Sequence, residues 1–347
     1  MTASRTTDAT LMRQEVTEIP DAIQRLLDAA PKMIEPAAKA IRAGGPKMIA
    51  TIARGSSDHC ATYLKYAFEI DAGIPVASLG PSVASIYGAR LELAGCMTIS
   101  ISQSGMSPDI VEATRAAGGG GAVVVSITNN AQSPLAGVSD HTFDIAAGPE
   151  RSVAATKTFV NSLIAGLLLL GYWRGNTDLL QALHKLPQQC RDALDCAWDP
   201  LISELRDARS LYVLGRGPSF AIANEVALKF KETCQMQAEA YSAAEVMHGP
   251  VSIVGEGFPV LALAGRDASL EPTLTAVSGL AANKAKTFTT AGKAEGAVTL
   301  DTVASGHPLT DPIPTLVSFY SFVETLARAR GRNPDAPPNL RKVTQTA

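Results

Sequence analysis

The sequence has few of the features that direct a chain to nucleic acid or to a membrane. Its 347 residues contain 30 Lys and Arg against 33 Asp and Glu, a formal net charge of -3, and no dense run of basic residues. A nucleic-acid-binding face needs a basic patch or stripe, so we expect no DNA or RNA partner. The longest apolar run, residues 163–173, is short of the ~20 residues that cross a bilayer. It predicts a buried helix and no membrane association.

Cysteines are also few, and the five present form no CxxC pair and no Cys/His cluster at zinc spacing. We therefore expect reduced, mostly buried thiols and no metal site. Residues 1–20 carry Asp8, Glu15 and Glu18 and lack the apolar stretch of a secretory signal. These features favour a cytoplasmic protein, and we expect no cofactor.

What the sequence does contain is a regular alternation of short apolar runs with helix-length segments. The runs that predict strands lie at 47–53, 96–102, 122–128, 141–146, 210–215, 258–264, 286–291 and 297–301. Strands that alternate with helices form parallel sheets with helices on both faces. The predicted fold class is therefore α/β, with two parallel, doubly wound sheets in a chain of this length.

The two halves of the chain resemble each other when they are aligned at a constant offset. The offset that places Arg54-Gly55 on Arg216-Gly217 also places Phe68 on Phe230, and it keeps the predicted strands, turns and helices in phase. We therefore predict two similar domains in tandem. The predicted segments are an N-terminal helical segment 1–44, a first domain 45–180, a connector helix 181–204, a second domain 205–332 and an irregular tail 333–347.

Hydroxyl and amide side chains gather where two strands of the first domain end. They are Ser56 and Ser57 after one strand, and Ser102, Gln103, Ser104, Gly105 and Ser107 after the other. In an open parallel sheet, ligands bind at the carboxyl ends of strands, where helix N-termini favour anions. Serine hydroxyls donate to anionic oxygens, and Gly105 permits a tight turn. We predict a phosphate site here, although serines at helix starts also serve as caps, a role we expect for Ser107 or a neighbour.

The second domain offers an internal comparison for this phosphate site. Its equivalent strand end contains Ala264, Gly265, Arg266 and Asp267. It has no serine cluster, and a carboxylate there would repel a phosphate. We therefore expect one anion site per chain.

Ionisable residues instead mark the second domain between 224 and 250. On a helix, Lys229 and Glu232 share one face at i, i+3 spacing, with Glu225 one turn earlier. The simplest interpretation of such a ladder is a solvated face, and for Glu225 we favour it.

His248 precedes Gly249-Pro250 and should therefore end a helix. The ordinary pKa of histidine suits a proton shuttle, but a single histidine more often packs or caps. Glu245-x-x-His248 is also similar to half of a carboxylate-bridged metal site. No second copy of this motif exists in the sequence, so we do not predict a metal there.

Six stretches match one known family: SQSG with Ser107, GSS after the first strand, VAATK at 153–157, ALKFKE ending at Glu232, AEAYSAAEVMHGP ending at Pro250, and PPNLRKVT in the tail. Together they resemble the tandem sugar isomerase (SIS) domain family, specifically the isomerase portion of glucosamine-6-phosphate synthase. The resemblance implies two flavodoxin-like domains, in agreement with the internal repeat.

The resemblance also implies a set of sugar-phosphate ligands and catalytic groups. The ligands would be Ser57, Ser102, Gln103, Ser104 and Ser107, with the backbone of Val153 along the sugar. Glu232 would move a proton between C1 and C2 beside Lys229, and Lys342 would engage C2. His248 would open the sugar ring from the partner subunit, which implies a homodimer.

Departures from the synthase pattern bear on the reaction. The 347 residues contain no glutaminase domain, Met106 replaces an acidic residue, Ala155 replaces a serine, and Arg341 adds a charge. We therefore expect a stand-alone glucosamine-6-phosphate deaminase that forms fructose 6-phosphate and ammonia. An alternative is a fructosamine-6-phosphate deglycase. A non-catalytic sugar-phosphate sensor is less favoured, because residues 1–44 are too short and insufficiently basic for a DNA-binding helix-turn-helix.

Overall fold

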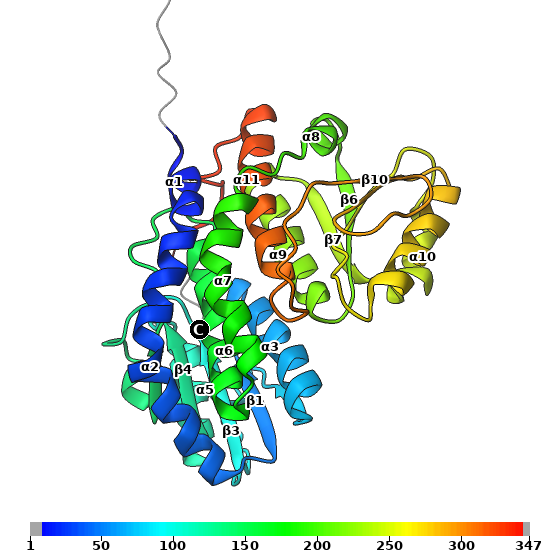
Figure 1. Ribbon diagram of the computed structural model, residues 1–347. Coiled ribbons are helices and arrows are strands. Elements are labelled where there is room, and N and C mark those ends of the chain that lie inside the picture. The colour runs from blue at the N-terminus through cyan, green and yellow to red at the C-terminus, as the bar shows by residue number, and fades with distance from the viewer. Residues whose placement is uncertain (1–8, 343–347) are drawn as a thin grey trace, which may run out of the picture.

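The computed structural model describes residues 9–342, which form two α/β domains in tandem (Figure 1). The first sheet contains β1 Met48–Ile52, β2 Val76–Ser78, β3 Cys96–Ile101, β4 Val123–Thr128 and β5 His141–Asp144. The second contains β6 Ser210–Gly215, β7 Gln237–Ser242, β8 Pro259–Ala262, β9 Lys286–Thr289 and β10 Ala297–Thr299. All pairings are parallel. The orders β2-β1-β3-β4-β5 and β10-β9-β8-β6-β7 are the same flavodoxin-like topology, so the predicted fold class is confirmed.

All eight predicted strands are present, and sequence analysis missed β2 and β7. These two are equivalent edge strands, each paired on one side only. β2 has only 3 residues, and β7 has the sequence QAEAYS. Neither is an apolar run, because an edge strand needs less apolar surface than a strand buried between two neighbours.

The helices cover both faces of each sheet. They are α1 Leu11–Thr17, α2 Ile19–Gly44, α3 Ser56–Ala72, α4 Ser82–Ser85, α5 Pro108–Gly119, α6 Lys157–Arg174, α7 Thr177–Ala193, α8 Asp199–Leu205, α9 Pro218–Cys234, α10 Leu270–Ala282 and α11 Pro312–Ala329. Short 3-10 turns are η1 Ala136–Val138, η2 Glu245–Met247 and η3 Pro250–Ile253. The apolar run at 163–173 lies in α6, which is almost entirely buried, as predicted. Within residues 9–342, no helix is both long enough and apolar enough to pass through a bilayer.

The internal repeat is visible in the structure at the turns that precede α3 and α9. Helices α3 and α9 start at Ser56 and Pro218, which are equivalent positions in the alignment of the two halves. The glycines that precede them, Gly55 and Gly217, have φ/ψ angles of 56°/-134° and 59°/-137°. Glycine adopts this positive φ without the steric cost that a side chain would add. The two strand-to-helix turns are therefore equivalent in backbone as well as in sequence.

The two domains meet through equivalent helices, because α3 packs against α9. Figure 1 shows these helices, together with α6, α7 and α11, between the two sheets. A single buried cluster extends from α2 and α6 through α3 and α9 to α11. This packing places the end of α9 close to the carboxyl ends of the first sheet.

Candidate functional site

A cavity of about 340 Å³ opens at the carboxyl ends of β1 and β3, beside the end of α9 and the C-terminal tail. It is lined by Arg54, Gly55, Ser57, Ile101, Ser102, Gln103, Ser104, Ser107, Ile110, Val153, Glu232, Leu340, Arg341 and Lys342. Predicted site residues from both domains and the tail thus meet in one place. The cavity is of the size that binds small molecules in other proteins.

The loop after β3 holds its shape through Gly105, which has φ +63°. A Cβ atom at this position would lie 2.1 Å from Ser133 Oγ, so only glycine fits. The amide of Gly105 donates to Ser102 Oγ at 3.2 Å, and that of Met106 donates to Ser104 Oγ at 3.2 Å. Each hydroxyl accepts from the backbone and keeps its own proton for another acceptor. Gly105 itself is buried and shapes the loop without lining the cavity.

Ser107 occupies the N-cap position of α5, with Pro108 at the first helical position, but its side chain makes no capping hydrogen bond. The prediction that Ser107 is the N-cap residue is therefore confirmed for its position, although its hydroxyl does not bond the amides of the first turn. The amides at this end of α5 carry the partial positive charge of a helix N-terminus. Ser107 thus adds a hydroxyl to the cavity wall next to a region that favours anions.

Ser56 does not line this cavity, unlike Ser57. Its hydroxyl donates to Glu225 Oε1 at 3.2 Å and accepts from Lys229 Nζ at 3.1 Å. Ser56 therefore belongs to the contact between α3 and α9. Its predicted contact with substrate stays a prediction.

The ladder of charges on α9 is buried, contrary to the solvated face favoured for Glu225. Glu225 and Lys229 are both 0% exposed. Their side chains lie 3.0 Å apart, and Lys229 Nζ lies 2.7 Å from Glu232 Oε2. His59 and Tyr320 also contact Glu225, at 3.0 and 3.3 Å. The solvated interpretation is wrong because α3 and α11 both pack against α9.

These contacts determine the charges of the pair. Burial by itself raises the pKa of Glu225, but the Lys229 ammonium and the hydrogen bond from His59 outweigh it and lower the pKa to about 2. Burial lowers the pKa of Lys229, whereas the charges of Glu225 and Glu232 raise it further, and the net pKa is raised. Both groups are therefore charged at neutral pH. Glu232, 17% exposed, is the member of the ladder that reaches the cavity, and Lys229 lies behind it.

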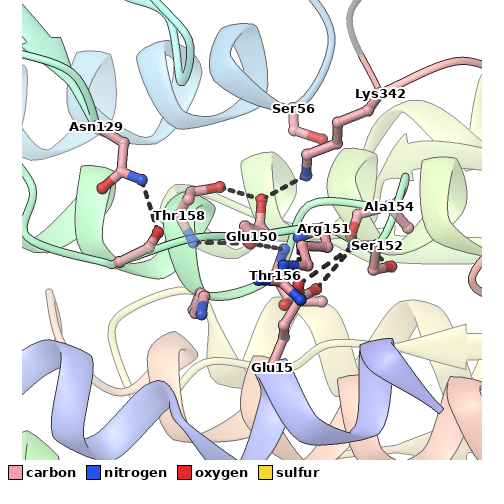
Figure 2. A network of polar contacts seen from close by, with 12 residues as sticks. Glu15, Ser56, Asn129, Glu150, Arg151, Ser152, Ala154, Thr156, Thr158 and Lys342 are labelled. Carbon is pink, nitrogen blue, oxygen red and sulfur yellow. Dashed lines mark hydrogen bonds and ion pairs between the residues drawn. The ribbon is translucent and has the colours of Figure 1, made fainter.

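Lys342 reaches the cavity from the tail and pairs with Glu150, which sequence analysis did not identify (Figure 2). Lys342 Nζ lies 2.9 Å from Glu150 Oε2. The buried Glu150 carboxylate also accepts from the amides of Thr156 and Thr158 and from the Thr158 hydroxyl, at 3.0, 3.1 and 2.7 Å. Burial raises the pKa of Glu150, but Lys342 and these donors lower it more. The only sequence feature that pointed to Glu150 was its position shortly before Val153, the first residue of the VAATK motif.

Helix α1 contacts the segments that carry both members of this ion pair. Glu15 accepts hydrogen bonds from the amides of Arg151 and Ser152, next to Glu150 (Figure 2). At the helix start, the amides of Leu11 and Met12 each donate to Asp335, at 2.8 Å. The helix therefore anchors both the loop of Glu150 and the tail of Lys342.

His248 is exposed and follows η2, but it does not line the cavity within its own chain. Its predicted supply by a partner subunit stays a prediction. Among residues 9–342, no group of three or more His, Cys, Asp or Glu side chains is arranged to hold a metal ion.

Comparison with protein-family models shows to which family the chain belongs. The SIS domain model matches residues 45–171 and 204–329. The chain belongs to the SIS-domain family. It is 31% identical over 350 residues to glutamine--fructose-6-phosphate aminotransferase [isomerizing] from Sulfurisphaera tokodaii, which covers 98% of this chain and 57% of that protein. The chain thus spans little more than half the length of this curated relative.

Several solved structures are similar to this chain over nearly its whole length. A candidate phosphosugar isomerase from Silicibacter pomeroyi is 54% identical, with a TM-score of 0.92 over 94% of this chain and 100% of that chain. The C-terminal domain of glucosamine-fructose-6-phosphate aminotransferase from Francisella tularensis is 26% identical, with a TM-score of 0.84 over 96% of this chain and 100% of that chain. Glucosamine-6-phosphate deaminase from Thermotoga maritima, 21% identical with a TM-score of 0.76 over 97% of this chain and 100% of that chain, shares the fold.

Proposed function

We propose that this protein is a phosphosugar isomerase that deaminates glucosamine 6-phosphate to fructose 6-phosphate and ammonia. One observation carries the proposal: a single cavity is lined by the serine loop 102–107, by Glu232 and by Lys342. A hexose phosphate needs an anion site at one end and acid-base groups at the other. The phosphosugar enzymes among the relatives support the same class of substrate.

The phosphate is bound by the loop after β3 and the start of α5. Ser102 and Ser104 present hydroxyl protons that their own loop does not use. Ser57 and Ser107 add two more hydroxyls to the wall. This end of the cavity fixes the sugar so that C1 and C2 point toward α9, which converts proton transfer into a positioned, effectively intramolecular step.

Glu232 is the base for the isomerisation. In the open-chain sugar it takes the proton from C2 and returns it to C1, while a second proton passes from the C2 amine to the C1 oxygen. The C1 aldehyde thereby becomes a hydroxymethyl group and the C2 amine becomes an imine. Replacement of the C2 imine nitrogen by oxygen from water then gives fructose 6-phosphate and ammonia. Lys229 donates a hydrogen bond to the Glu232 carboxylate and directs it at the cavity.

Lys342 engages C2, and His248 opens the ring. The Lys342 amine displaces ammonia from the C2 imine and forms an imine of its own, which water hydrolyses to the ketone. His248 reaches the cavity of a second copy in a symmetric homodimer, because it is exposed and lies off the cavity of its own chain.

Arg341 favours a second candidate, a fructosamine-6-phosphate deglycase. This exposed arginine lines the cavity and makes no hydrogen bond or ion pair to another described residue. If the substrate nitrogen carried an amino acid, its carboxylate would find a cation there.

Measurement of the released ammonia or amine, together with fructose 6-phosphate and glucose 6-phosphate, separates these functions. The assay uses the purified chain with a panel of 6-phosphorylated amino sugars and 6-phosphorylated fructosamines. The proposal expects the highest kcat/KM with glucosamine 6-phosphate and loss of turnover, with retained substrate binding, in Glu232→Gln. The exposed Glu271→Gln variant is the matched control. Full activity of Glu232→Gln, or turnover of fructosamines alone, would contradict the proposal.

A further inference from the structure

We propose that Arg54 is a further phosphate-binding residue, aimed by the buried carboxylate of Asp109, and that it makes the site selective for dianionic phosphate esters. In the sequence, Arg54 stands out only through its match to Arg216 in the internal repeat. The inference rests on the proposed function in that it takes the cavity as a sugar-phosphate site. Its test is a binding measurement, which does not depend on turnover.

Arg54 connects the two strand ends that form the phosphate end of the cavity. It follows β1 and precedes Gly55 and α3, whereas Asp109 lies in the first turn of α5. The Arg54 Nε donates to Asp109 Oδ2. The Asp109 side chain is 1% exposed and that of Arg54 is 45% exposed. Because Asp109 occupies the Nε edge, the two Nη groups are the donors available to a ligand in the cavity.

The buried partner is what separates Arg54 from an ordinary surface charge. An exposed ion pair contributes little, because two mobile side chains must be ordered in water. Asp109 is already fixed in α5 and withdrawn from solvent, so it holds the guanidinium plane in one orientation. A pre-oriented guanidinium binds phosphate through two parallel N–H donors and loses less entropy when it does so.

The other charges around the cavity indicate which part of the ligand Arg54 binds. The serine hydroxyls are neutral, Lys342 pairs with Glu150, and Lys229 pairs with two carboxylates. Arg54 pairs with Asp109 through Nε only, so its two Nη groups can respond to the second negative charge of a phosphate ester beside the serine loop. Arg341 also lines the cavity, but it comes from the tail and has no buried carboxylate among the described residues to orient it. We infer that Arg54 raises affinity for the dianion over the monoanion and over an unphosphorylated sugar.

The internal repeat supplies a matched control. In the alignment of the two halves, Arg216 is equivalent to Arg54 and Glu271 to Asp109. Arg216 precedes α9 as Arg54 precedes α3, but neither it nor Glu271 lines the cavity. Substitution of Arg216 or Glu271 therefore removes the same chemical group without touching the proposed site.

The experiment measures binding of inorganic phosphate, glucose 6-phosphate and glucose by calorimetry between pH 5 and 8. Arg54→Ala should weaken binding of both phosphates about 10- to 100-fold, the range for a charge-assisted hydrogen bond. Arg54→Lys should restore only part of this affinity. Asp109→Asn should also weaken phosphate binding, because the guanidinium loses its orientation, and the double variant Arg54→Ala/Asp109→Asn should be no worse than Arg54→Ala.

The pH profile tests selectivity for the dianion. Wild-type affinity should rise as the pH passes about 6, where a phosphate ester loses its second proton, and the rise should be smaller in Arg54→Ala. Wild-type phosphate affinity in Arg54→Ala, or an equal loss for glucose, would overturn the inference, as would a similar loss in Arg216→Ala. If Arg54→Ala does not fold, Arg54→Lys and Asp109→Asn decide the same question.

The two proposals fail in different ways. Arg54-dependent phosphate binding without ammonia release from any substrate would contradict the proposed function alone. Ammonia release together with a phosphate affinity that does not depend on Arg54 would contradict this inference alone.

Discussion

Lys229 Nζ lies 2.7 Å from Glu232 Oε2, with the lysine fully buried and the glutamate at the edge of the cavity. A buried ammonium thus holds a carboxylate that reaches substrate. Since Lys229 Nζ also donates to Ser56 Oγ of α3 at 3.1 Å, the position of Glu232 depends on the packing between the domains.

Lys229→Met should lower kcat about 100-fold with little change in KM, because a small displacement of the base costs much of the rate. Steady-state kinetics on glucosamine 6-phosphate measure both constants. Lys231→Met, an exposed change on the same helix, should behave as wild type. Wild-type kcat in a folded Lys229→Met variant would rule out the positioning role.

Glu225→Gln should destabilise the fold by about 3 kcal/mol at pH 7, because it leaves Lys229 buried with one carboxylate fewer. The pKa of Glu225 is lowered from 4.5 to about 2, so the stability that its charge contributes is present above pH 4.5 and is lost as the pH falls toward 2. Urea unfolding at several pH values should therefore show the gap between wild type and variant shrinking across this window. The exposed Glu245→Gln is the control, and a gap that stays constant with pH would contradict the assignment.

Lys342 should be the residue that forms an imine with the sugar. Borohydride reduction in the presence of fructose 6-phosphate should add the reduced sugar to the peptide that contains Lys342, as measured by mass spectrometry. Lys342→Arg should abolish this adduct. Label on another lysine, or its persistence in Lys342→Arg, would show that Lys342 is not the amine that engages C2.

Glu15 should act on the site through the loop that contains Glu150. Glu15→Ala removes the acceptor for the Arg151 and Ser152 amides and should lower kcat about tenfold, because the loop of Glu150 loses two hydrogen bonds that position a catalytic group. Glu15→Gln keeps an acceptor oxygen and should restore most of the rate. Gln14→Ala, exposed on the same helix, serves as the control, and equal defects in Glu15→Ala and Glu15→Gln would indicate a merely structural role.

Variants of His248 and Glu232 should restore each other's activity when they are combined in one dimer. Glu232→Gln and His248→Ala should each be inactive alone, but mixed dimers place both defects in one site and leave the other intact. Equal mixing after reversible dissociation should therefore restore about a quarter of wild-type activity, since half the dimers are mixed and each has one working site. No recovery in verified mixed dimers would place His248 in its own chain's site or outside catalysis.

Much of the fold follows from local sequence. Eight of the strands, the buried helix α6 and the internal repeat are visible because apolar runs and turn glycines act on near neighbours. The edge strands β2 and β7 lack that pattern and were missed. The serine loop was also predictable, since Gly105 and the start of α5 lie beside it in the chain.

The sequence by itself thus determined the class of fold, its duplication and which residues could bind a phosphate. The tertiary structure alone decided that Glu225 is buried, that Glu150 pairs with Lys342, and that Arg54 is aimed by Asp109. The physical reason is that spacing along a helix or loop shows which residues share a face, but not which distant element covers it. Burial and the nearest opposite charge set the pKa and orientation of an ionisable side chain. Lys229 is a near neighbour of Glu225 on α9, but the partners His59 of Glu225, Lys342 of Glu150 and Asp109 of Arg54 come from segments 55 to 192 residues away.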